Sequence, residues 1–472
     1  MEDDTIREET PVVIIGGGLT GLSLATQLDM QSVPFVLLEH SGRLGGQVQT
    51  LRENGFVFEI GPNTGILSTP EVAELFEYAA PDAELEVADN AANSRWIWKG
   101  DRFHPIPCGI WSGLTTPLYS WKDKLGMPLE PFRKKGTNPN ETVGELAERR
   151  LGKSIVEYTI DPFIGGIYAG DPYQLVTRLA MPKLYDLEQK YGSFIGGAIK
   201  KAQEPKSERD KKATKKIFSA VGGLENLIRA LSKKIVRTGR IELEVKSIKI
   251  DRFGEAWATS FVDSCGVGHR LVSKHVVTTV RADILPDLFP KEWGDSFANI
   301  ATLPYAPITE VCVGFKHLPD IPHAAFGALV PSKERREVLG ILFPSSCFKS
   351  RTEYSDGALF TVFMGGLRNQ ELFFSSTAED QKEIALRELY AMMKIPKDIL
   401  PDMVYVERYP KAIPQYDLAT EIRQRDMKEI EKANPGLHLA GGMIDGIGMA
   451  NRITQGMKLG KRIADDYGEI LE

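Results

Sequence analysis

The chain has 472 residues, of which 42% are apolar and 26% charged, an ordinary globular balance with room for two or three domains. Its net charge of −6 excludes the basic field that a nucleic-acid partner needs. No run approaches the roughly 18 apolar residues of a membrane-spanning helix. The acidic, polar start MEDDTIREET lacks the pattern of a secretion signal.

The four cysteines, Cys108, Cys265, Cys312 and Cys347, are scattered along the chain. They form no C-x-x-C pair, and no histidine lies beside them at ligand spacing. This pattern favours neither a metal site nor a disulfide framework. We therefore expect no metal and predict buried, reduced thiols.

The first motif is a strand followed by a glycine-rich turn and a helix. The β-branched run at 11–15 is typical of a buried parallel strand, and residues 16–21 (GGGLTG) fit G-x-G-x-x-G. Apolar residues at helical spacing follow, and a second strand at 35–38 ends at Glu39. Because these parts occur in order, they predict a dinucleotide-binding βαβ unit rather than an accidental glycine-rich turn.

Each glycine of the motif has a physical task. Gly16 permits the tight turn, Gly18 lets a pyrophosphate approach the backbone, and Gly21 lets helix and strand pack closely. Leu19 and Thr20 lie at the start of the helix, where unpaired N–H groups attract the diphosphate. These residues are our first cofactor contacts.

The residues after the second strand extend the cofactor site. The Glu39 carboxylate is placed to accept hydrogen bonds from ribose hydroxyls, and it disfavours NADP because it would repel a 2′-phosphate. His40 is its neighbour in this site. Arg43, in the string SGRLGG, would neutralise phosphate charge, while Gly45 and Gly46 let the backbone approach the cofactor.

The rest of the chain alternates between helical and extended patterns. One segment, 200–216, is highly charged; a solvated loop is the favoured interpretation, and contact with membrane headgroups is the alternative. The other expected elements are, in chain order, a helix at 70–80, a hairpin at 91–107, mostly helices over 108–213 with one ending at Gly152, an amphipathic helix within 218–234, a strand at 241–250, one antiparallel sheet over 307–370, a helix at 377–393, and a strand from 437 that ends in glycines and leads into a helix.

Longer strings narrow the family. The R-x-G-G after Glu39 resembles the extended FAD signature of the flavin amine oxidase and protoporphyrinogen oxidase superfamily. DPFIGGIYAGDP, MPKLYDLEQKYGSFIGG and IFSAVGGLENL resemble the oxygen-dependent protoporphyrinogen oxidases and the coproporphyrinogen oxidases of the same fold. The resemblance covers nearly the whole chain, from about residue 11 to residue 465.

The resemblance implies an α/β fold, α+β overall, with non-covalent FAD. It also implies peripheral contact with a membrane, which we expect on the cytoplasmic face of the inner membrane, and it leaves a homodimer open. The expected parts are a Rossmann-like FAD-binding domain (1–85, 214–300 and 404–472), an inserted antiparallel-sheet substrate domain (86–107 and 301–403) and a mostly helical, membrane-contacting subdomain (108–213).

The resemblance also assigns further residues. Arg95 resembles an arginine that pairs with a propionate, Leu329 and Leu342 resemble residues that sandwich a pyrrole ring, and Phe363 resembles an aromatic that stacks on another ring. Tyr168 and Gly170 are expected to border this pocket. The alternatives are a surface position for Arg95 and ordinary sheet core for Leu342 and Phe363. The remaining expected cofactor contacts are Gly61, Pro62, Asn63, Thr64, Val245, Gly442, Ile447, Gly448 and Met449.

The implied reaction is the oxidation of a porphyrinogen to a porphyrin in haem biosynthesis. Six electrons leave in three flavin cycles, with oxygen as the acceptor and hydrogen peroxide as the product. No catalytic general base is assigned, because aromatisation drives the reaction. The choice between protoporphyrinogen and coproporphyrinogen stays open at this point. The rivals are a flavin amine oxidase, a carotenoid desaturase and a non-catalytic tetrapyrrole or flavin carrier.

Overall fold

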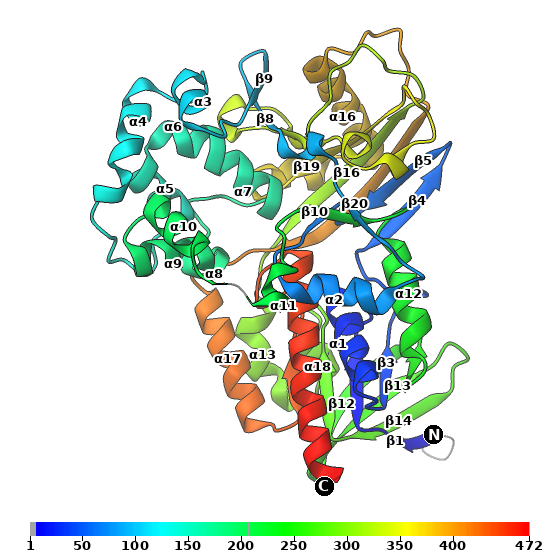
Figure 1. Ribbon diagram of the computed structural model, residues 1–472. Coiled ribbons are helices and arrows are strands. Elements are labelled where there is room, and N and C mark those ends of the chain that lie inside the picture. The colour runs from blue at the N-terminus through cyan, green and yellow to red at the C-terminus, as the bar shows by residue number, and fades with distance from the viewer. Residues whose placement is uncertain (1–5, 206, 472) are drawn as a thin grey trace.

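The computed structural model describes residues 6–205 and 207–471, which form three regions around a central junction (Figure 1). A region of sheet and helix lies at the bottom of Figure 1, a strand-rich region at the upper right and a helical region at the upper left. Both chain ends lie in the bottom region, away from the junction. None of the described helices is long and apolar enough to cross a membrane.

The bottom region is built on a five-stranded sheet in which all neighbouring strands run parallel. The two strands predicted around the glycine turn lie side by side, with Val12 opposite Phe35. This is the expected Rossmann-like sheet. The strands in order across it are β11 (Gly239–Glu242), β3 (Phe35–Leu38), β2 (Val12–Ile15), β15 (His275–Thr278) and β21 (Leu437–Leu439).

The first and last helices of the chain pack together on one face of this sheet. They run in the same direction, because Gly456 lies against Thr20 and Gly460 lies against Leu24. Their N-termini therefore point toward the same part of the junction. The helices of this layer are α1 (Leu19–Met30), α2 (Pro70–Ala79), α12 (Glu225–Ile235) and α18 (Met449–Leu471).

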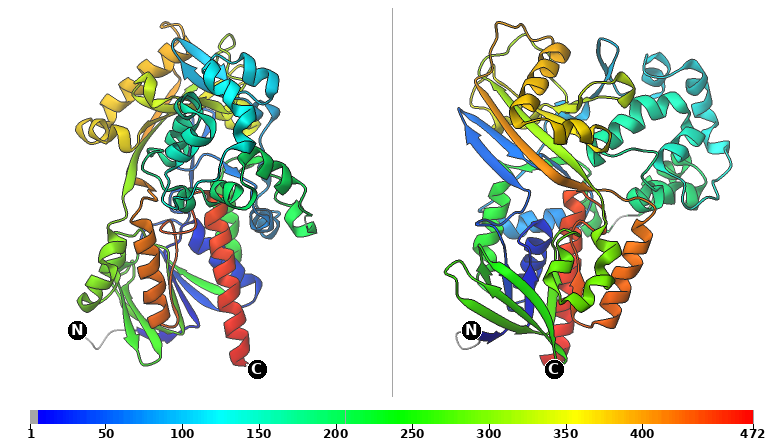
Figure 2. Two further views of the ribbon diagram at one scale, coloured as in Figure 1. Left: turned by 90° about the vertical axis from the view of Figure 1, so that its left-hand side faces the viewer. Right: turned by 180° about the vertical axis from the view of Figure 1, so that it is seen from behind.

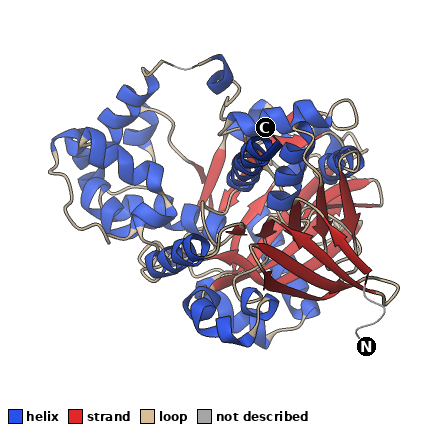
Figure 3. Cartoon of the chain, turned by 90° about the horizontal axis from the view of Figure 1, so that it is seen from below, coloured by secondary structure: helices blue, strands red, loops and turns tan. Residues whose placement is uncertain are grey.

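A four-stranded sheet and two helices complete the bottom region, which Figure 3 shows from below. Trp257 and Phe261 of this sheet share a buried cluster with Val13 and Ile15 of β2. The elements are β1 (Ile6–Glu9), β14 (Gly268–Ser273), β13 (Ala256–Val262), β12 (Lys246–Phe253), α13 (Gly294–Ala301) and α17 (Thr420–Ala433).

The prediction of a single strand at 241–250 is wrong. The chain leaves β11 after Glu242 and enters β12, in a different sheet, at Lys246. Glu244 has a φ of 56° and Ser247 a φ of 54°. These left-handed conformations interrupt an extended chain, although the alternating residue pattern is that of one strand.

The strand-rich region is a seven-stranded sheet that contains the runs expected between 307 and 370 (Figure 2). These runs pair with one another in antiparallel fashion, as expected, whereas β8, from the expected hairpin at 91–107, joins β17 in parallel. The expected domain boundary at residue 404 separates β20 from this sheet, although β20 is hydrogen-bonded to β16. The order is β20 (Met403–Pro414), β16 (Tyr305–Phe315), β19 (Ala358–Gly365), β18 (Val338–Leu342), β17 (Gly327–Leu329), β8 (Arg95–Lys99) and β9 (Arg102–Pro105).

The two faces of the seven-stranded sheet have different surroundings. Val311, Ile341 and Phe360 belong to a buried cluster that includes residues of α16. Because side chains alternate along strands, their neighbours point to the other face, toward the centre of the molecule. We call this the junction face; its members include Arg95, Glu310, Leu329, Leu342, Thr361 and Phe363. The nearby helices are α14 (Pro344–Cys347), α15 (Gln370–Ser375) and α16 (Ala378–Met393).

Two small sheets connect the bottom and strand-rich regions. Phe56 and Phe58 of a hairpin pack in one cluster with Cys312 of the junction face. The hairpin consists of β4 (Gln49–Glu53) and β5 (Phe56–Ile60), and the other sheet has the order β6 (Gly65–Ile66), β10 (Ile217–Ala220) and β7 (Leu85–Val87).

The third region is helical, as expected. Thr142 and Glu145 form a capping box at the start of α5, and Gly152 ends that helix as predicted. Arg150 is buried and donates hydrogen bonds to Glu130 (2.8 Å) and Glu188 (3.0 Å). The helices are α3 (Ile110–Thr115), α4 (Trp121–Gly126), α5 (Val143–Leu151), α6 (Lys153–Ile155), α7 (Asp161–Tyr168), α8 (Thr177–Ala180), α9 (Pro182–Tyr191), α10 (Phe194–Ala202) and α11 (Glu208–Lys211).

The described residues of the charged segment 200–216 are almost all exposed, as the favoured interpretation of a solvated loop expects, but part of the segment is helical. It contains the end of α10 and the whole of α11. Arg209 forms ion pairs with Glu71 (3.0 Å) and Glu74 (2.7 Å) of α2. These carboxylates offset the positive charge of Arg209, so contact with α2 explains part of the charged pattern.

The cysteines differ in their burial. Cys312 and Cys347 are buried as expected, whereas Cys108 and Cys265 are exposed. Burial raises the pKa of the Cys347 thiol to about 12. This thiol is therefore protonated at neutral pH.

Candidate functional site

The turn between β2 and α1 has the geometry that the three glycines predict. Gly16 has a φ of 105°, and a Cβ there would lie 2.4 Å from Thr279 Oγ1. A Cβ on Gly21 would lie 2.0 Å from the Gly16 carbonyl oxygen, whereas one on Gly18 would meet nothing within 4 Å. The backbone at Gly18 therefore borders open space, into which a pyrophosphate could fit.

Two parallel helices begin on the junction side of the bottom region. Gly18 precedes α1, and no side chain caps this helix start, where Leu19 and Thr20 form the first turn. Met449 begins α18, whereas Gly456 is the residue of α18 that lies against Thr20. The start of α18 therefore lies about 10 Å beyond the start of α1. Ile447 and Gly448 precede this second helix start, as expected, and each start brings positive potential to the junction.

Glu39 lies at the end of β3, as predicted. Its carboxylate accepts hydrogen bonds from the backbone N–H of Gly17 (2.7 Å) and of Ser41 (2.8 Å). The Val245 N–H donates to the Glu39 carbonyl (3.1 Å), and His40 Nδ1 lies 3.2 Å from the Val245 carbonyl. The structure therefore brings Glu39, His40 and Val245 together; contacts with ribose and adenine stay predictions.

Arg43 holds the loop that follows. Its guanidinium donates to the carbonyls of Gly46 (2.6 Å) and Val48 (3.0 Å). Gly45 in turn donates from its N–H to the Gly17 carbonyl (2.8 Å). The loop is thereby fixed beside the glycine turn, and neutralisation of phosphate by Arg43 stays a prediction.

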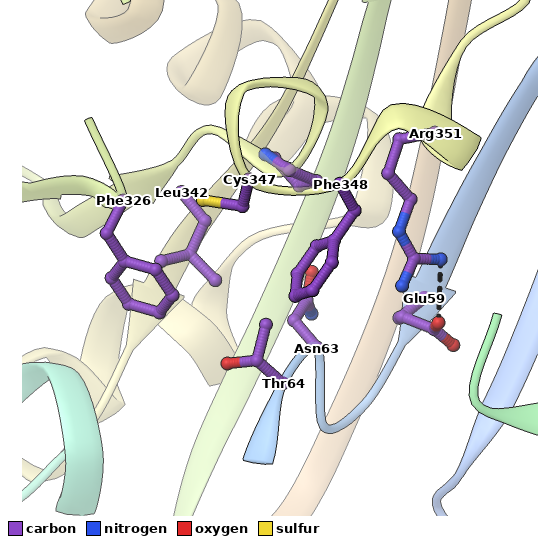
Figure 4. Close-up of a pocket in the computed structure, with 9 residues that line it drawn as sticks. Glu59, Asn63, Thr64, Phe326, Leu342, Cys347, Phe348 and Arg351 are labelled. Atoms are coloured by element: carbon purple, nitrogen blue, oxygen red, sulfur yellow. Dashed lines mark hydrogen bonds and ion pairs between the residues drawn. The ribbon is translucent and has the colours of Figure 1, made fainter. Parts of the chain in front are cut away.

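The turn formed by Gly61, Pro62, Asn63 and Thr64 reaches the junction face. Asn63 and Thr64 line a narrow pocket together with Leu342 (Figure 4). This pocket joins residues that the sequence assigned separately to the cofactor and the substrate. Its other lining residues are Glu59, Phe326, Pro344, Cys347, Phe348 and Arg351.

The four residues expected around the pyrrole rings lie on four neighbouring strands. They share the junction face, because directly paired residues on adjacent strands point the same way. All four are half-buried, and Leu342 and Phe363 lie outside the buried cluster under α16. Phe363 packs instead against Ala306 and Ile308, and the roles of these residues around the rings stay predictions. The cross-strand rows are Arg95–Gly327–Leu342 and Leu329–Gly340–Phe363.

Tyr168 and Gly170 lie at the end of α7, away from the pocket lining. Tyr168 is buried, its hydroxyl donates to the Ala180 carbonyl (2.6 Å), and burial raises its pKa to about 12. A Cβ on Gly170 would lie 2.5 Å from Gln415 Oε1. Ala169, between them, shares a hydrophobic cluster with Phe363, so the segment borders the junction face through its backbone and Ala169.

The DPFIGGIYAGDP string serves to attach α7 to the seven-stranded sheet. Arg368, which follows β19, pairs with Asp161 and with Asp171 (2.8 Å). Asp161 also accepts a hydrogen bond from the Ser332 N–H (2.7 Å). The two acids of the string thus position the helical region against the junction.

Two residues of the site were missed in the sequence. Thr279, after β15, donates to the Gly16 carbonyl (3.0 Å). Arg452 of α18 donates to the carbonyls of Gly441 and Ile444 in the loop that contains Gly442. Burial lowers the pKa of Arg452, and its Nε is buried without a hydrogen-bond partner among the described residues. Neither residue belongs to a recognisable sequence pattern.

Known proteins share this architecture. Residues 19–450 match the family described as "Flavin containing amine oxidoreductase". The chain is 29% identical to protoporphyrinogen oxidase 2 of Arabidopsis thaliana over 95% of this chain and 92% of that protein. It is 28% identical to the human protoporphyrinogen oxidase over 94% of this chain and 96% of that protein.

Solved structures show the same fold. A protein of Exiguobacterium sp. 255-15, provisionally assigned as a protoporphyrinogen oxidase, superimposes with a TM-score of 0.79 at 24% identity, over 98% of this chain and 99% of its own. Reduced UDP-galactopyranose mutase superimposes with a TM-score of 0.71 at 15% identity, over 96% of this chain and 93% of its own. At such identities the likeness concerns the fold alone.

The residues present fit an FAD. Gly18 borders open space, α1 starts without a side-chain cap, and Glu39 follows the second strand. The unpartnered Nε of Arg452 adds a donor near the start of α18. The dinucleotide turn and the match to a flavin-containing family together make FAD the cofactor and the protein an oxidoreductase. The chain belongs to the flavin-containing amine oxidoreductase family.

Proposed function

We propose that this protein oxidises protoporphyrinogen IX to protoporphyrin IX in haem biosynthesis, with oxygen as the final acceptor. The observation that carries the proposal is the junction face. One cation, two aliphatic side chains and one aromatic ring lie on this face on four adjacent strands, and Leu342 among them lines the pocket with Asn63 and Thr64 of the 61–64 turn. A flat apolar ligand with a charged edge suits such a surface.

Arg95 is the anchor in this proposal. Its guanidinium carbon lies 5.3 Å from the centre of the Phe326 ring, beside the pocket that contains Leu342. A propionate bound by this guanidinium would orient the apolar part of the substrate along the sheet. Because the pocket has room for little more than one water molecule, the ring system lies outside it, across Leu329 and Phe363.

The protein's task is to orient the substrate and exclude water. A bound flavin supplies an acceptor for hydride and returns the electrons to oxygen as hydrogen peroxide. Leu329, Leu342 and Phe363 keep a ring in place for transfer from a meso carbon, and Arg95 fixes its rotation. Aromatisation drives the reaction, so we assign no general base.

The test is the formation of fluorescent porphyrin by the FAD-loaded protein in air. We expect protoporphyrinogen to be oxidised well above its autoxidation rate. Coproporphyrinogen and a small panel of amines serve as parallel substrates. Faster oxidation of coproporphyrinogen, or peroxide released only with amines, would contradict the proposal.

We also propose that α3, α4 and the following turn contact a membrane surface. Trp111, Trp121, Leu125, Leu129 and Phe132 are each 58–84% exposed, and Figure 1 places α3 and α4 at the outer edge of the helical region. Exposed aromatic and aliphatic side chains of this kind insert at the interface of a bilayer.

Vesicle flotation tests this contact. The double variant W111S/F132S should lose binding to anionic vesicles. A matched control is L400S/L418S, which removes two other exposed leucines (75% and 59%) from a different region. Equal binding of the two variants to the vesicles would contradict the membrane contact.

The sequence leaves a homodimer open. Light scattering of the same protein samples distinguishes a monomer from a homodimer.

A further inference from the structure

Glu310 is a buried acid in the middle of an apolar strand. It lies in β16, and only 3% of its surface is exposed to solvent. Among the described residues, no lysine or arginine forms an ion pair with it, and burial has the largest effect on its pKa. A carboxyl group in such a place is costly unless hydrogen bonds compensate for the loss of water.

The contacts of Glu310 all lead to the turn at 61–64. Its Oε1 accepts a hydrogen bond from the Gly61 N–H (3.1 Å), and its Oε2 accepts one from Asn63 Nδ2 (3.1 Å). Asn63 Nδ2 also donates to the Gly61 carbonyl (3.1 Å), and Asn63 Oδ1 accepts from the Thr361 hydroxyl (3.3 Å). These partners permit only one orientation of the Asn63 amide.

This network lies between the two halves of the site. Glu310 is directly opposite Phe363 in the pairing of β16 and β19, so both side chains are on the junction face. Asn63 reaches the pocket that Leu342 lines (Figure 4). One hydrogen-bonded chain thus connects the strand that carries Phe363 with a turn expected to meet the flavin.

We propose that Glu310 is a positioning residue: through its two hydrogen bonds it holds the 61–64 turn and the Asn63 amide in the orientation that the flavin site requires. The part of this inference that concerns substrate turnover rests on the proposed function. The part that concerns flavin binding does not.

The charge on Glu310 follows from its surroundings. Burial raises the pKa of Glu310 well above its usual range. The titratable groups that face it from neighbouring strands are Glu407 and Tyr409 of β20, Glu59 of β5 and Cys312 of its own strand, and all of these are acids.

The substitution Glu310→Gln tests the proposal without changing size. The glutamine side chain keeps one acceptor oxygen, but its NH₂ group cannot accept a hydrogen bond. This NH₂ group must therefore face one of the two donors, the Gly61 N–H or Asn63 Nδ2. Either one hydrogen bond is lost or the Asn63 amide turns over. We expect FAD to bind about tenfold more weakly, consistent with one lost buried hydrogen bond. We also expect a changed visible circular dichroism of the bound flavin.

A matched control makes the test specific. Glu407→Gln removes the carboxylate directly opposite Glu310 on β20, and it should leave FAD affinity and the flavin spectrum unchanged. The double variant E310Q/N63D should not recover what E310Q loses, because a carboxylate at position 63 cannot donate to the Gly61 carbonyl as the Asn63 amide does.

The outcomes separate this inference from the proposed reaction. If E310Q equals the wild type and E407Q in FAD affinity and circular dichroism, the positioning role is wrong whatever the substrate. If E310Q does not fold, Thr361→Val, which removes the donor to Asn63, must change the flavin spectrum; no change overturns the inference. With porphyrinogen, E310Q should lower kcat and leave KM within about twofold.

Discussion

The guanidinium of Arg351 donates a 2.8 Å hydrogen bond to the carboxylate of Glu59, and both side chains are almost completely buried. Arg351 follows α14 beside the seven-stranded sheet, whereas Glu59 lies in β5. Glu59 also accepts a hydrogen bond from the Leu224 N–H (2.9 Å) in the bottom region. The pair thus joins the two regions at the wall of the pocket (Figure 4).

Removing one member of this pair should destabilise the fold. R351M leaves the Glu59 carboxyl buried without its cation, and we expect a loss of about 3 kcal/mol in the free energy of unfolding. The double variant E59M/R351M should lose less, because no charge is left unpaired. Urea unfolding measures the free energy of unfolding of both variants. The control is R425A, which removes the arginine of an ion pair at the surface. Equal losses of stability in R351M and R425A would contradict the account.

Two glycines of the dinucleotide turn should respond differently to the same change. A Cβ on Gly18 meets nothing in the protein, so G18A should fold normally and bind FAD at least about tenfold more weakly. A Cβ on Gly21 would lie 2.0 Å from the Gly16 carbonyl, so G21A should lower the thermal midpoint of the apoprotein. G113A, where a Cβ also meets nothing, is the control; FAD affinity equal in G18A and G113A would contradict the site.

Acid should weaken the bottom region through two stacked histidines. The rings of His275 and His438 are 5.4 Å apart, and burial lowers the pKa of His438 from 6.5 to about 3. Between these two pKa values the unfolded chain binds a proton at His438 that the folded chain does not bind. The contribution of His438 to the free energy of unfolding is therefore fully present above pH 6.5 and is lost as the pH falls toward 3.

Through His438, the free energy of unfolding changes by at most about 1.4 kcal/mol per pH unit. H438Q should flatten the decline of the thermal midpoint between neutral pH and about pH 4. His317 is exposed and provides the matched control, H317Q. An unchanged pH profile in H438Q would show that another group causes the acid sensitivity.

Arg95 should act in binding rather than in chemistry. R95A should raise KM for protoporphyrinogen about tenfold, the effect of one lost charge-assisted hydrogen bond, with kcat nearly unchanged. Arg102, on the adjacent strand β9 and largely exposed, provides the control R102A. A fall in kcat at unchanged KM would mean that Arg95 does not anchor the propionate.

The cofactor half of the site could be predicted because its signals are local. The strand, the glycines at 16, 18 and 21, and Glu39 follow one another within one βαβ unit. The glycines act through backbone conformation, and Glu39 acts through its position at the end of the second strand. The split of 241–250 escaped prediction because alternation continues through Glu244 and Ser247, where only φ reveals the break.

The polar residues at the junction could not be found in this way. Glu310 and Glu59 acquire partners that are distant in sequence, Asn63 and Arg351 respectively, and only the packing of separate sheets brings them together. A lone acid inside ITEVCVGF was the one available signal. The face shared by Arg95 and Leu342 likewise depends on a parallel pairing of β8 with β17 that no local pattern indicates.

The central claim is that a porphyrinogen reacts with a flavin held at the glycine turn. The most direct measurement is an anaerobic titration of the FAD-loaded protein with protoporphyrinogen, followed by admission of air. The account predicts loss of the yellow flavin absorbance under anaerobic conditions and its return with oxygen, together with porphyrin. A flavin that stays oxidised in the presence of bound porphyrinogen would contradict it.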